Sequence, residues 1–461
     1  MASLDEATRR EIGQHFVFGF HGQEISEDVK TLITKYYVGN IILMKRNIRD
    51  AENTLKIVLG LQQLAQEAGH ERPLLIGIDQ ENGLVSAFSS PTAGTQFPGA
   101  MAQAAIGDLE ITRKIAAACG QELRLAGITW TYSPVADVNI NPLNPVIGVR
   151  SFGSVGEYAT AASQGFVSSG VASCAKHFPG HGDTHVDSHL ALPVINKTKE
   201  EIYAGDLPPF QALIAADIPS IMTAHIALPL LTGDNTPASL SRKITTDLLR
   251  GELKYEGLVV TDCLEMEAVS SVEKGGCGCE EGAVRALVAG ADIAMICHTY
   301  AWQVGAVEQT YAAVESGRIS LEELKRSGER IAAMKDKFTG GWNGLVGQEL
   351  TFADAWEGVK KKNVELSAEA YRKSTTVVMD TGSLLPLKRA RIKNILLLTP
   401  QRSEINKAVD GSADENRNPG NTQPVRNTAA PYDKKFVEIL ESRGAVEHVI
   451  YGPGLSGNGM R

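Results

Sequence analysis

The chain has 461 residues, 43% of them hydrophobic and 21% charged, which is typical of a globular protein of two or three domains. The net charge of −9 argues against nucleic acid or an anionic membrane as the main partner. The N-terminus, MASLDEATRREIGQHF, lacks the apolar core of a secretory signal, and no stretch of about 18 apolar residues predicts a membrane span, so we expect a cytoplasmic protein.

Short apolar runs of strand length alternate with helix-like segments over the first 300 residues. The runs are HFVFGF (15–20), NIILM (40–44), LLIGID (74–79), TWTYSPVADV (129–138), SCAKHF (173–178), SIMTAHI (220–226), GLVVTD (257–262) and DIAMIC (292–297). The longer segments between them include 50–69, 108–126, 199–216 and 243–253. This alternation predicts an α/β fold, either a (β/α)₈ TIM barrel or a doubly wound open sheet.

The positions of the polar residues favour the barrel. Asp79, Asp137, Lys176 with His177, His225 and Asp262 lie at or just after the ends of five different runs. Chemistry in a TIM barrel collects at the C-terminal ends of its strands, so we expect these side chains to share one face.

A second, smaller α/β domain is predicted to follow the barrel. The Gly-rich stretch TGGWNGLVG (339–347) marks a boundary, which gives a catalytic barrel at 1–338, a linker at 339–372 and a partial or small domain at 373–461. In that domain, 374–380, 392–400 and 446–452 read as strands and 433–443 as a helix. The polar segment 401–431 reads as a mobile loop.

The segment CAKHFPGHGDTHVDSHLALP (174–193) carries four histidines, each four residues from the next. On a helix this spacing would suggest a metal site, but Pro179 and the glycines beside it break any helix. We therefore expect a strand end followed by a loop, and a metal-dependent hydrolase that uses these histidines remains an alternative. In an extended stretch, Asp187 and His189 can lie side by side, so that the carboxylate orients the imidazole and makes it a general acid/base near neutral pH.

Asp262 ends the seventh apolar run, where a carboxylate can attack the anomeric carbon of a sugar. Retaining glycoside cleavage needs such a nucleophile and one proton donor, the role left for the Asp187–His189 pair. Asp79 is suited to bind vicinal sugar hydroxyls, Lys176 and His177 to bind neighbouring hydroxyls, and Arg150 to bind a hydroxyl or an amide carbonyl. A helix cap or a salt bridge at the barrel rim is the structural alternative for Asp262.

The strings GIDQENG, SPVADVNINPLNPVIGVRSFG, AKHFPGHGDTHVDSH, MTAHIALP and LLRGELKYEGLVVTDCLEME, in this order, resemble the β-N-acetylglucosaminidase branch of glycoside hydrolase family 3. The resemblance covers about residues 15–300, and beyond residue 400 it is weak. It implies that Asp262 is the nucleophile of a retaining enzyme, that His189 assisted by Asp187 is the acid/base, and that Asp79, Arg150, Lys176 and His177 bind the N-acetylglucosamine ring. It further implies that Arg46 reaches the site and that Met266 lines it.

The chain departs from the family pattern after DQE, where Asn82, Leu84 and Ala87 stand in place of a glycine and two arginines. The loss of these basic residues disfavours a peptidoglycan-type aglycone. The expected partners are therefore simple β-GlcNAc glycosides and chitooligosaccharides. No cofactor and no metal are expected, because the one close cysteine pair, Cys277 and Cys279, has no second pair to complete a site.

Other functions remain open on the sequence alone. A histidine donor does not repel phosphate as a carboxylate would, so a GlcNAc phosphorylase is one alternative. A β-glucosidase is another, since the preference for GlcNAc rests on the resemblance. A carbohydrate-binding module is disfavoured because a binder needs no nucleophile. The oligomeric state is left open.

Overall fold

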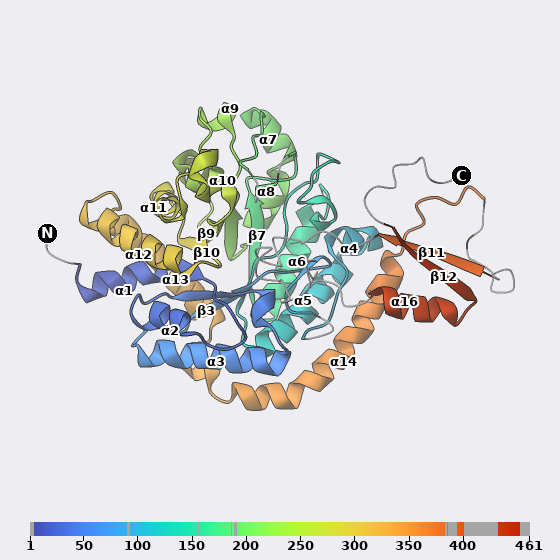
Figure 1. The fold of residues 1–461 in the computed structure, drawn as a ribbon. Coiled ribbons are helices and arrows are strands. Elements are labelled where there is room, and N and C mark those ends of the chain that lie inside the picture. The colour runs from blue at the N-terminus through green and yellow to red at the C-terminus, as the bar shows by residue number, and fades with distance from the viewer. Residues whose placement is uncertain are drawn as a thin grey trace. The chain divides into compact units, whose positions relative to one another are not determined.

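The structure is a computed structural model that describes residues 4–89, 93–154, 156–185, 187–188, 191–382, 385, 394–400 and 432–451. The chain divides into two compact units, 1–374 and 375–461. In the first unit, parallel strands close into a barrel in the order β1-β10-β9-β8-β7-β6-β3-β2, and helices surround it (Figure 1). The predicted (β/α)₈ barrel is therefore confirmed.

Each of the eight predicted apolar runs coincides with one barrel strand to within one residue or contains it. The strands are β1 (Phe16–Phe18), β2 (Asn40–Leu43), β3 (Leu75–Ile78), β6 (Trp130–Thr131), β7 (Ala172–Phe178), β8 (Ser220–Thr223), β9 (Leu258–Cys263) and β10 (Ile293–Ile296). A short antiparallel hairpin, β4 (Gln80–Asn82) with β5 (Val85–Ser86), follows β3 at its C-terminal end.

The helices of the first unit occupy the segments between the strands and after the last one. They are α1 (Glu6–Gln14), α2 (Glu27–Thr34), α3 (Ala51–Glu67), α4 (Ala100–Ile106), α5 (Leu109–Leu125), α6 (Gly156–Ser168), α7 (Lys199–Gly205), α8 (Pro208–Ala215), α9 (Pro229–Thr232), the π-helix η4 (Lys243–Glu252), α10 (Glu267–Ser270), α11 (Cys279–Ala289), α12 (Tyr300–Glu315), α13 (Leu321–Phe338) and α14 (Gln348–Ser374). The segment 199–216, predicted as one helix, is two, because Pro208 and Pro209 occupy the first turn of α8.

Alternation along the short strands builds two apolar layers. Val17, Ile42 and Leu75 belong to the cluster inside the barrel, whereas Phe16 and Phe18 pack outward against the helices. Because successive side chains of a strand point to opposite faces, a run that is apolar throughout is buried on both. Burial on both faces explains why the sequence shows continuous apolar runs. Polar residues can therefore be accommodated mainly at the strand ends.

The second unit contains β11 (Asn394–Pro400), α16 (Tyr432–Glu441) and β12 (Ala445–Tyr451), and the two strands pair in parallel. The predicted strands at 392–400 and 446–452 and the helix at 433–443 match these elements. The predicted strand at 374–380 is wrong: Ser374 ends α14, and the side chains of Val378 and Met379 are exposed. A strand needs a hydrogen-bonded neighbour, and none of the described residues pairs with this segment. The predicted loop at 401–431 lies outside the described residues.

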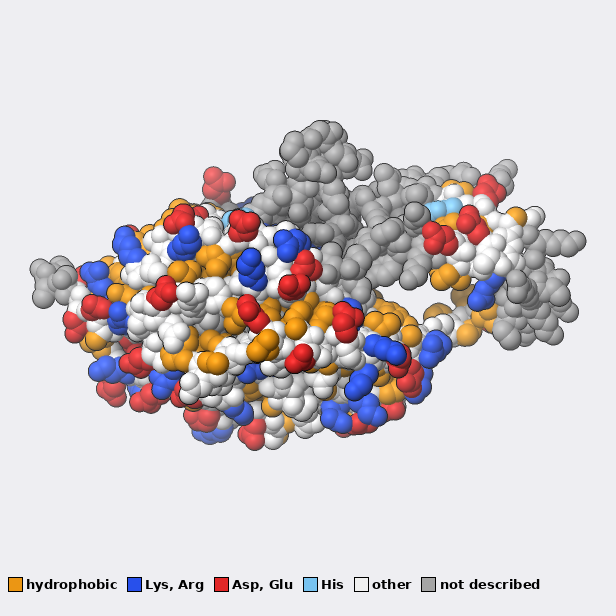
Figure 2. All heavy atoms as spheres, turned by 90° about the horizontal axis from the view of Figure 1, so that it is seen from below, with side chains coloured by type: hydrophobic (Ala, Val, Ile, Leu, Met, Phe, Trp, Pro, Cys, Tyr) orange, Lys and Arg blue, Asp and Glu red, His pale blue; other side chains and the backbone are white. Residues whose placement is uncertain are grey.

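Figure 2 shows one face of the molecule, on which Lys and Arg side chains of the described residues are interspersed with Asp and Glu. Such mixing fits the modest net negative charge of the chain. None of the helices in the described ranges combines the length and the apolar character that crossing a bilayer requires.

Candidate active site

The C-terminal ends of the barrel strands bring together the polar side chains that the sequence placed after its apolar runs. Asp79 follows β3, Lys176 and His177 lie near the end of β7, His225 follows β8, and Asp262 lies in β9. Because all eight strands run in the same direction, these five positions share one face of the barrel.

Lys176 and Arg150 hold two carboxylates from the β3 end of the site. Lys176 Nζ donates to Asp79 Oδ1 at 2.6 Å and forms an ion pair with Glu81 Oε1 at 2.7 Å. Arg150 binds Glu81 through both edges of the carboxylate, with Nε at 2.8 Å and Nη2 at 2.7 Å. Lys176, Arg150 and Glu81 are buried, so each side chain is fixed by the others before any ligand arrives.

Burial and charge act in opposite directions on these groups. Burial alone would raise the pKa of Glu81, but the charges of Arg150 and Lys176 lower it to about 2. For Asp79, burial prevails over Lys176 and raises the pKa. Burial works against the charged form of Lys176, yet Asp79 and Glu81 raise its pKa. The site therefore keeps an ammonium and a guanidinium beside a firmly ionised Glu81.

A second group of buried residues joins β6 to β7. Asp137 Oδ2 lies 2.6 Å from His177 Nδ1, and Asp137 Oδ1 accepts from the backbone N–H of His181 at 2.7 Å. Burial raises the pKa of Asp137, but the neighbouring imidazoles of His177 and His181 outweigh this and lower it. Asp137 thus orients the ring of His177 and fixes the first turn of the loop that follows β7.

The histidines of this loop have separate local partners. His181 lies 2.9 Å from Thr184 Oγ1 through Nδ1 and 3.0 Å from Ser188 Oγ through Nε2, while His185 Nδ1 lies 2.9 Å from Asn141 Nδ2. Burial lowers the pKa of His181 to about 4, so its ring is neutral at physiological pH. Among the described residues, the loop histidines do not gather into a metal-binding group.

The loop after β7 is not helical in its described part, as Pro179 predicts, and it runs across the barrel toward β9. Gly182 passes so close to the segment after β6 that an added Cβ would lie 1.7 Å from Val138 O. Further on, Ser188 is buried, and its carbonyl accepts from the N–H of Ala268 in α10 at 3.4 Å. Asp187, next to Ser188, is half-buried, and His189 lies outside the described residues.

Asp262 lies on β9, within electrostatic reach of both groups described above. Its negative charge contributes to raising the pKa of Asp79 and opposes the lowering of the pKa of His181. The N–H of Cys263 donates to Asp262 Oδ1 at 2.7 Å, and His225 Nε2 lies 2.9 Å from Cys263 O. The backbone beside the Asp262 carboxylate is therefore held by the end of β8.

Arg46 and Met266 reach the same end of the barrel. Arg46, which follows β2, donates to Phe20 O at 2.9 Å and to Cys297 O at 2.6 Å. It therefore links the segments that follow β1, β2 and β10. Met266 is buried at the start of α10, four residues after Asp262.

One group of described residues has the composition of a soft-metal site. Donor atoms of Cys263, Cys297 and His298 lie within 4.8 Å of one another. Arg46 Nη1, however, lies 2.9 Å from His298 Nδ1, which places a positive charge where a cation would have to bind. The arrangement fits a hydrogen-bonded cluster better than a metal site.

Two acidic residues at this end of the barrel have roles that the sequence did not suggest. Glu81 is the carboxylate that Lys176 and Arg150 share. In the sequence, its position two residues after Asp79 is the feature that could have indicated a place in the site. Glu265 accepts the backbone N–H groups of Cys297 and His298 at 2.7 and 2.6 Å and that of Thr299 at 2.8 Å. Glu265 thereby fixes the turn after β10, a contact between distant segments that spacing along the chain does not reveal.

Residues 7–334 match the model of the glycosyl hydrolase family 3 N-terminal domain. The chain belongs to glycosyl hydrolase family 3. The predicted family is thereby confirmed, and the family 3 barrel accounts for most of the first unit.

Relatives within the family carry consistent names. The chain is 35% identical over 402 residues to "Beta-hexosaminidase A" of Pseudoalteromonas piscicida. The match covers 82% of this chain and 65% of the relative. It is 32% identical to "Beta-hexosaminidase" of Idiomarina loihiensis, and this match covers 66% of this chain and 94% of that relative.

Solved structures agree with these relatives. A family 3 β-N-acetylglucosaminidase from Paenibacillus sp. superposes with a TM-score of 0.82 at 34% identity. The superposition covers 98% of this chain and 80% of the Paenibacillus chain. A fungal multi-domain family 3 β-N-acetylglucosaminidase has a TM-score of 0.85 at 37% identity and covers 97% of this chain. This chain spans 50% of that fungal protein and 65% of the Pseudoalteromonas relative, so it corresponds to part of each.

Proposed function

We propose that the chain is a retaining β-N-acetylglucosaminidase that releases terminal β-linked GlcNAc from simple glycosides and chitooligosaccharides. Asp262 is the nucleophile, and His189, assisted by Asp187, is the acid/base. The names of the family 3 relatives support the substrate class. The polar groups gathered at the C-terminal face of the barrel support the location of the site.

The contact between the loop after β7 and the segment after β9 carries this proposal. Ser188 O accepts from Ala268 N, six residues after Asp262, and Ser188 lies between Asp187 and His189 in sequence. The loop is therefore tethered, at Ser188, to the segment that follows the strand of the proposed nucleophile. A sugar bound between the two needs its nucleophile on one side of the anomeric carbon and its proton donor at the leaving oxygen.

The buried network binds the ring. Asp79 offers carboxylate oxygens to two adjacent hydroxyls, and Lys176 donates to a neighbouring hydroxyl from its place between Asp79 and Glu81. His177 binds a hydroxyl with the ring nitrogen that does not face Asp137. Arg150 is held through both Nε and Nη2, so its remaining donors are directed by Glu81 toward a hydroxyl or the acetamido carbonyl. Arg46 and Met266 border the site.

The reaction has two steps. Asp262 attacks the anomeric carbon and forms a glycosyl ester, while His189 gives its proton to the departing glycosidic oxygen. His189, now neutral, then removes a proton from water, which attacks the same carbon and releases Asp262 as a carboxylate. Asp187 stabilises the imidazolium form of His189, so the proton donor is ready at neutral pH.

The nucleophile assignment is tested with Asp262→Asn on aryl β-GlcNAc substrates. We expect turnover to fall by roughly a thousandfold or more because the amide cannot form the covalent intermediate, with the melting temperature close to that of the wild type. Asp217→Asn, the same change on the loop before β8 at the opposite end of the barrel, is the matched control and should keep full activity. Wild-type turnover by Asp262→Asn would overturn the assignment.

The acid/base assignment is tested by varying the leaving group. His189→Ala should lose roughly 10²–10⁴-fold in kcat/KM with a poor leaving group and much less with a good one, because a good leaving group needs little protonation. Equal losses with both would contradict the role. The same assays with and without phosphate, together with aryl β-glucoside and β-xyloside, identify the acceptor and the sugar preference. Faster consumption with phosphate and release of a sugar phosphate would replace hydrolysis with phosphorolysis.

A further inference from the structure

An arginine-lined pocket of about 230 Å³ lies at the N-terminal end of the barrel, opposite Asp262. Its walls come from η4, the residues just before β10, and α13. The residues on which the argument rests are Arg242, Arg250, Glu323, Arg326, Ser327 and Arg330. None of them belongs to the site at the C-terminal ends of the strands.

The pocket carries more positive than negative charge. Beneath it, the fully buried Asp292 accepts from Arg330 Nε and Nη2 through Oδ1 and from Arg250 Nη2 through Oδ2. Glu323 is the carboxylate in the wall, and it lies 3.5 Å from Arg242 Nη2. Four arginines against two carboxylates leave an excess of two positive charges around a small cavity.

Arg250 and Arg326 keep donor groups that no described residue accepts. Arg250 Nε is buried and has no hydrogen-bond partner among the described residues. Arg326, in the wall of the pocket, is exposed and forms no ion pair or hydrogen bond with any residue that the structure describes. The guanidinium of Arg326 is therefore available to an anion in the pocket through charge-assisted hydrogen bonds, which are roughly twice as strong as neutral ones.

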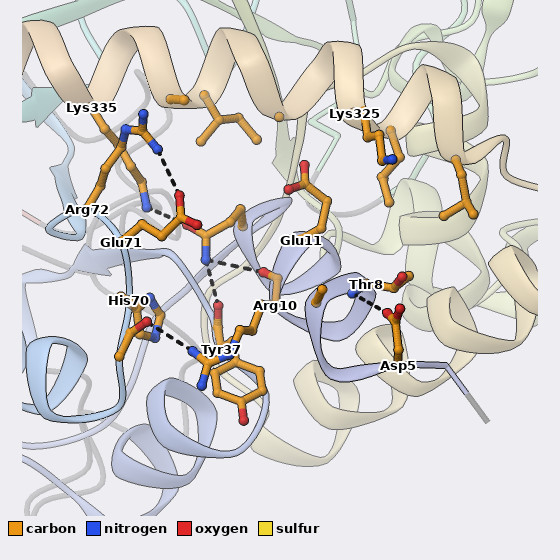
Figure 3. Close-up of a pocket in the computed structure, with 18 residues that line it drawn as sticks. Asp5, Thr8, Arg10, Glu11, Tyr37, His70, Glu71, Arg72, Lys325 and Lys335 are labelled. Atoms are coloured by element: carbon orange, nitrogen blue, oxygen red, sulfur yellow. Dashed lines mark hydrogen bonds and ion pairs between the residues drawn. The ribbon is translucent and has the colours of Figure 1, made fainter.

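A second pocket, on the other side of α13, provides the contrast (Figure 3). It also contains four cationic side chains, but Arg72 pairs with both Glu71 and Asp336, and Arg10 donates to the carbonyls of Ala68 and Gly69. Lys335 donates to Gln14 Oε1 and Gly39 O. The lining of this pocket also holds three carboxylates, those of Asp5, Glu11 and Glu71, whereas the wall of the arginine-lined pocket sets only Glu323 against four arginines.

We propose that the arginine-lined pocket binds a small oxyanion of the phosphate class, either inorganic phosphate or the phosphate group of a small metabolite. Guanidinium groups match the oxygens of a phosphate with pairs of N–H donors. The cavity is smaller than the pockets of about 300–1,000 Å³ that hold drug-sized ligands, so it suits the anion itself with little more attached. A long polyanion is disfavoured because the net charge of the chain is −9.

Binding is tested on the full chain with inorganic phosphate, by calorimetric titration and by thermal unfolding at constant ionic strength set with chloride. We expect one saturable site and a melting temperature that rises with phosphate, because the ligand binds the folded state. The double variant R242A/R326A should bind about tenfold or more weakly, since it loses two charged donors. Lys325→Ala removes the same charge from the adjacent position on α13, which faces the other pocket, and should bind as the wild type does.

Two further arms separate this pocket from the active site and identify the source of the phosphate. Saturating GlcNAc should leave phosphate binding unchanged, whereas phosphate held beside Lys176 and Arg150 would be displaced. A hexose phosphate that binds more tightly than inorganic phosphate would assign the ligand to phosphorylated sugars, and equal affinities would assign it to the free ion. Absence of saturable binding, equal binding by R242A/R326A, or displacement by GlcNAc would each overturn the proposal.

Discussion

The carboxylate of Glu81 is the residue on which the order of the site depends. It is buried, yet it is shared between the guanidinium of Arg150 and the ammonium of Lys176. Removing this buried carboxylate leaves Arg150 without its counter-charge and Lys176 with Asp79 alone, which costs more than the lost contacts. Glu81 touches no reacting atom in the proposed mechanism, so it acts by positioning the groups that bind the sugar.

Glu81→Gln should therefore impair both stability and substrate binding. We expect unfolding to require about 3 kcal/mol less free energy, and KM for an aryl β-GlcNAc to rise more than kcat falls, because Arg150 and Lys176 lose their fixed directions. Denaturant unfolding and steady-state kinetics measure the two effects. Glu110→Gln, which removes an exposed carboxylate paired with Arg113, is the matched control and should change neither. Unchanged KM in Glu81→Gln would remove its positioning role.

At the scale of secondary-structure elements, the barrel strands were predictable because they are buried on both faces. Continuous apolar runs mark such strands, and each of the eight runs overlaps one barrel strand. The segment 374–380 has the same apolar character, but strand pairing is a long-range property that composition does not encode. The helix break at Pro208 was visible in the sequence, whereas the π-helical form of η4 was not.

The candidate site was predictable to the extent that its residues follow strands. Asp79, Lys176, His177 and Asp262 were placed at strand ends, and strand direction alone brings them to one face. The partners that fix them come from segments far apart in the chain. Arg150 meets Glu81 across 69 residues, and Glu265 meets the turn after β10 across more than 30. Such pairings depend on how the loops fold over the barrel, which a single sequence does not specify.

The loop after β7 depends on a close passage at Gly182. An added Cβ would lie 1.7 Å from Val138 O, so Gly182→Ala must push the loop away from the segment that follows β6. We expect a loss of stability of about 1–3 kcal/mol and a fall in kcat, because the displaced loop no longer holds Ser188 against Ala268. Gly358→Ala on α14, where an added Cβ meets nothing within 4 Å, is the control. It should preserve activity and stabilise the chain by up to about 1 kcal/mol.

A Gly182→Ala variant with normal kcat would show that the loop reaches its position by another route. A fall in kcat without any change in stability would instead indicate that the displaced loop remains well packed. Measuring both quantities on the two glycine variants separates a local effect on the loop from a general loss of folding.

At the scale of the whole molecule, the first unit extends past the barrel to the end of α14. Asn363 donates to Ala118 O and Glu122 Oε1 in α5, and Ser367 donates to Gln96 O. Glu122 is buried, so its carboxylate depends on these donors and on Thr95. The helix that was expected to be a linker is thus packed on the helices of the barrel, and its polar side chains satisfy buried groups there.

Two buried histidines at opposite ends of the barrel make the stability of the molecule sensitive to pH. Burial lowers the pKa of His70 to about 4, and burial with the charge of His177 lowers that of His181 to about 4, from an ordinary value of 6.5. Between pH 6.5 and 4, both histidines are protonated in the unfolded chain but stay neutral in the folded chain. The stabilisation is therefore complete above pH 6.5 and is lost as the pH falls toward 4, by roughly 3 kcal/mol for each histidine.

Urea unfolding at several pH values between 7.5 and 4.5 measures this dependence. We expect His70→Gln and His181→Gln each to flatten the curve by a similar amount, and the double variant to flatten it by the sum, because residues at opposite ends of the barrel act independently. Each variant must be compared with itself at pH 7.5, since the substitutions also change local hydrogen bonds to Ile33 and to Thr184 and Ser188. A wild-type slope in both single variants would mean that other groups dominate the acid response. Below pH 4.5 a further loss should follow as Glu81 is protonated toward its pKa of about 2, and Glu81→Gln should lack that last part of the curve.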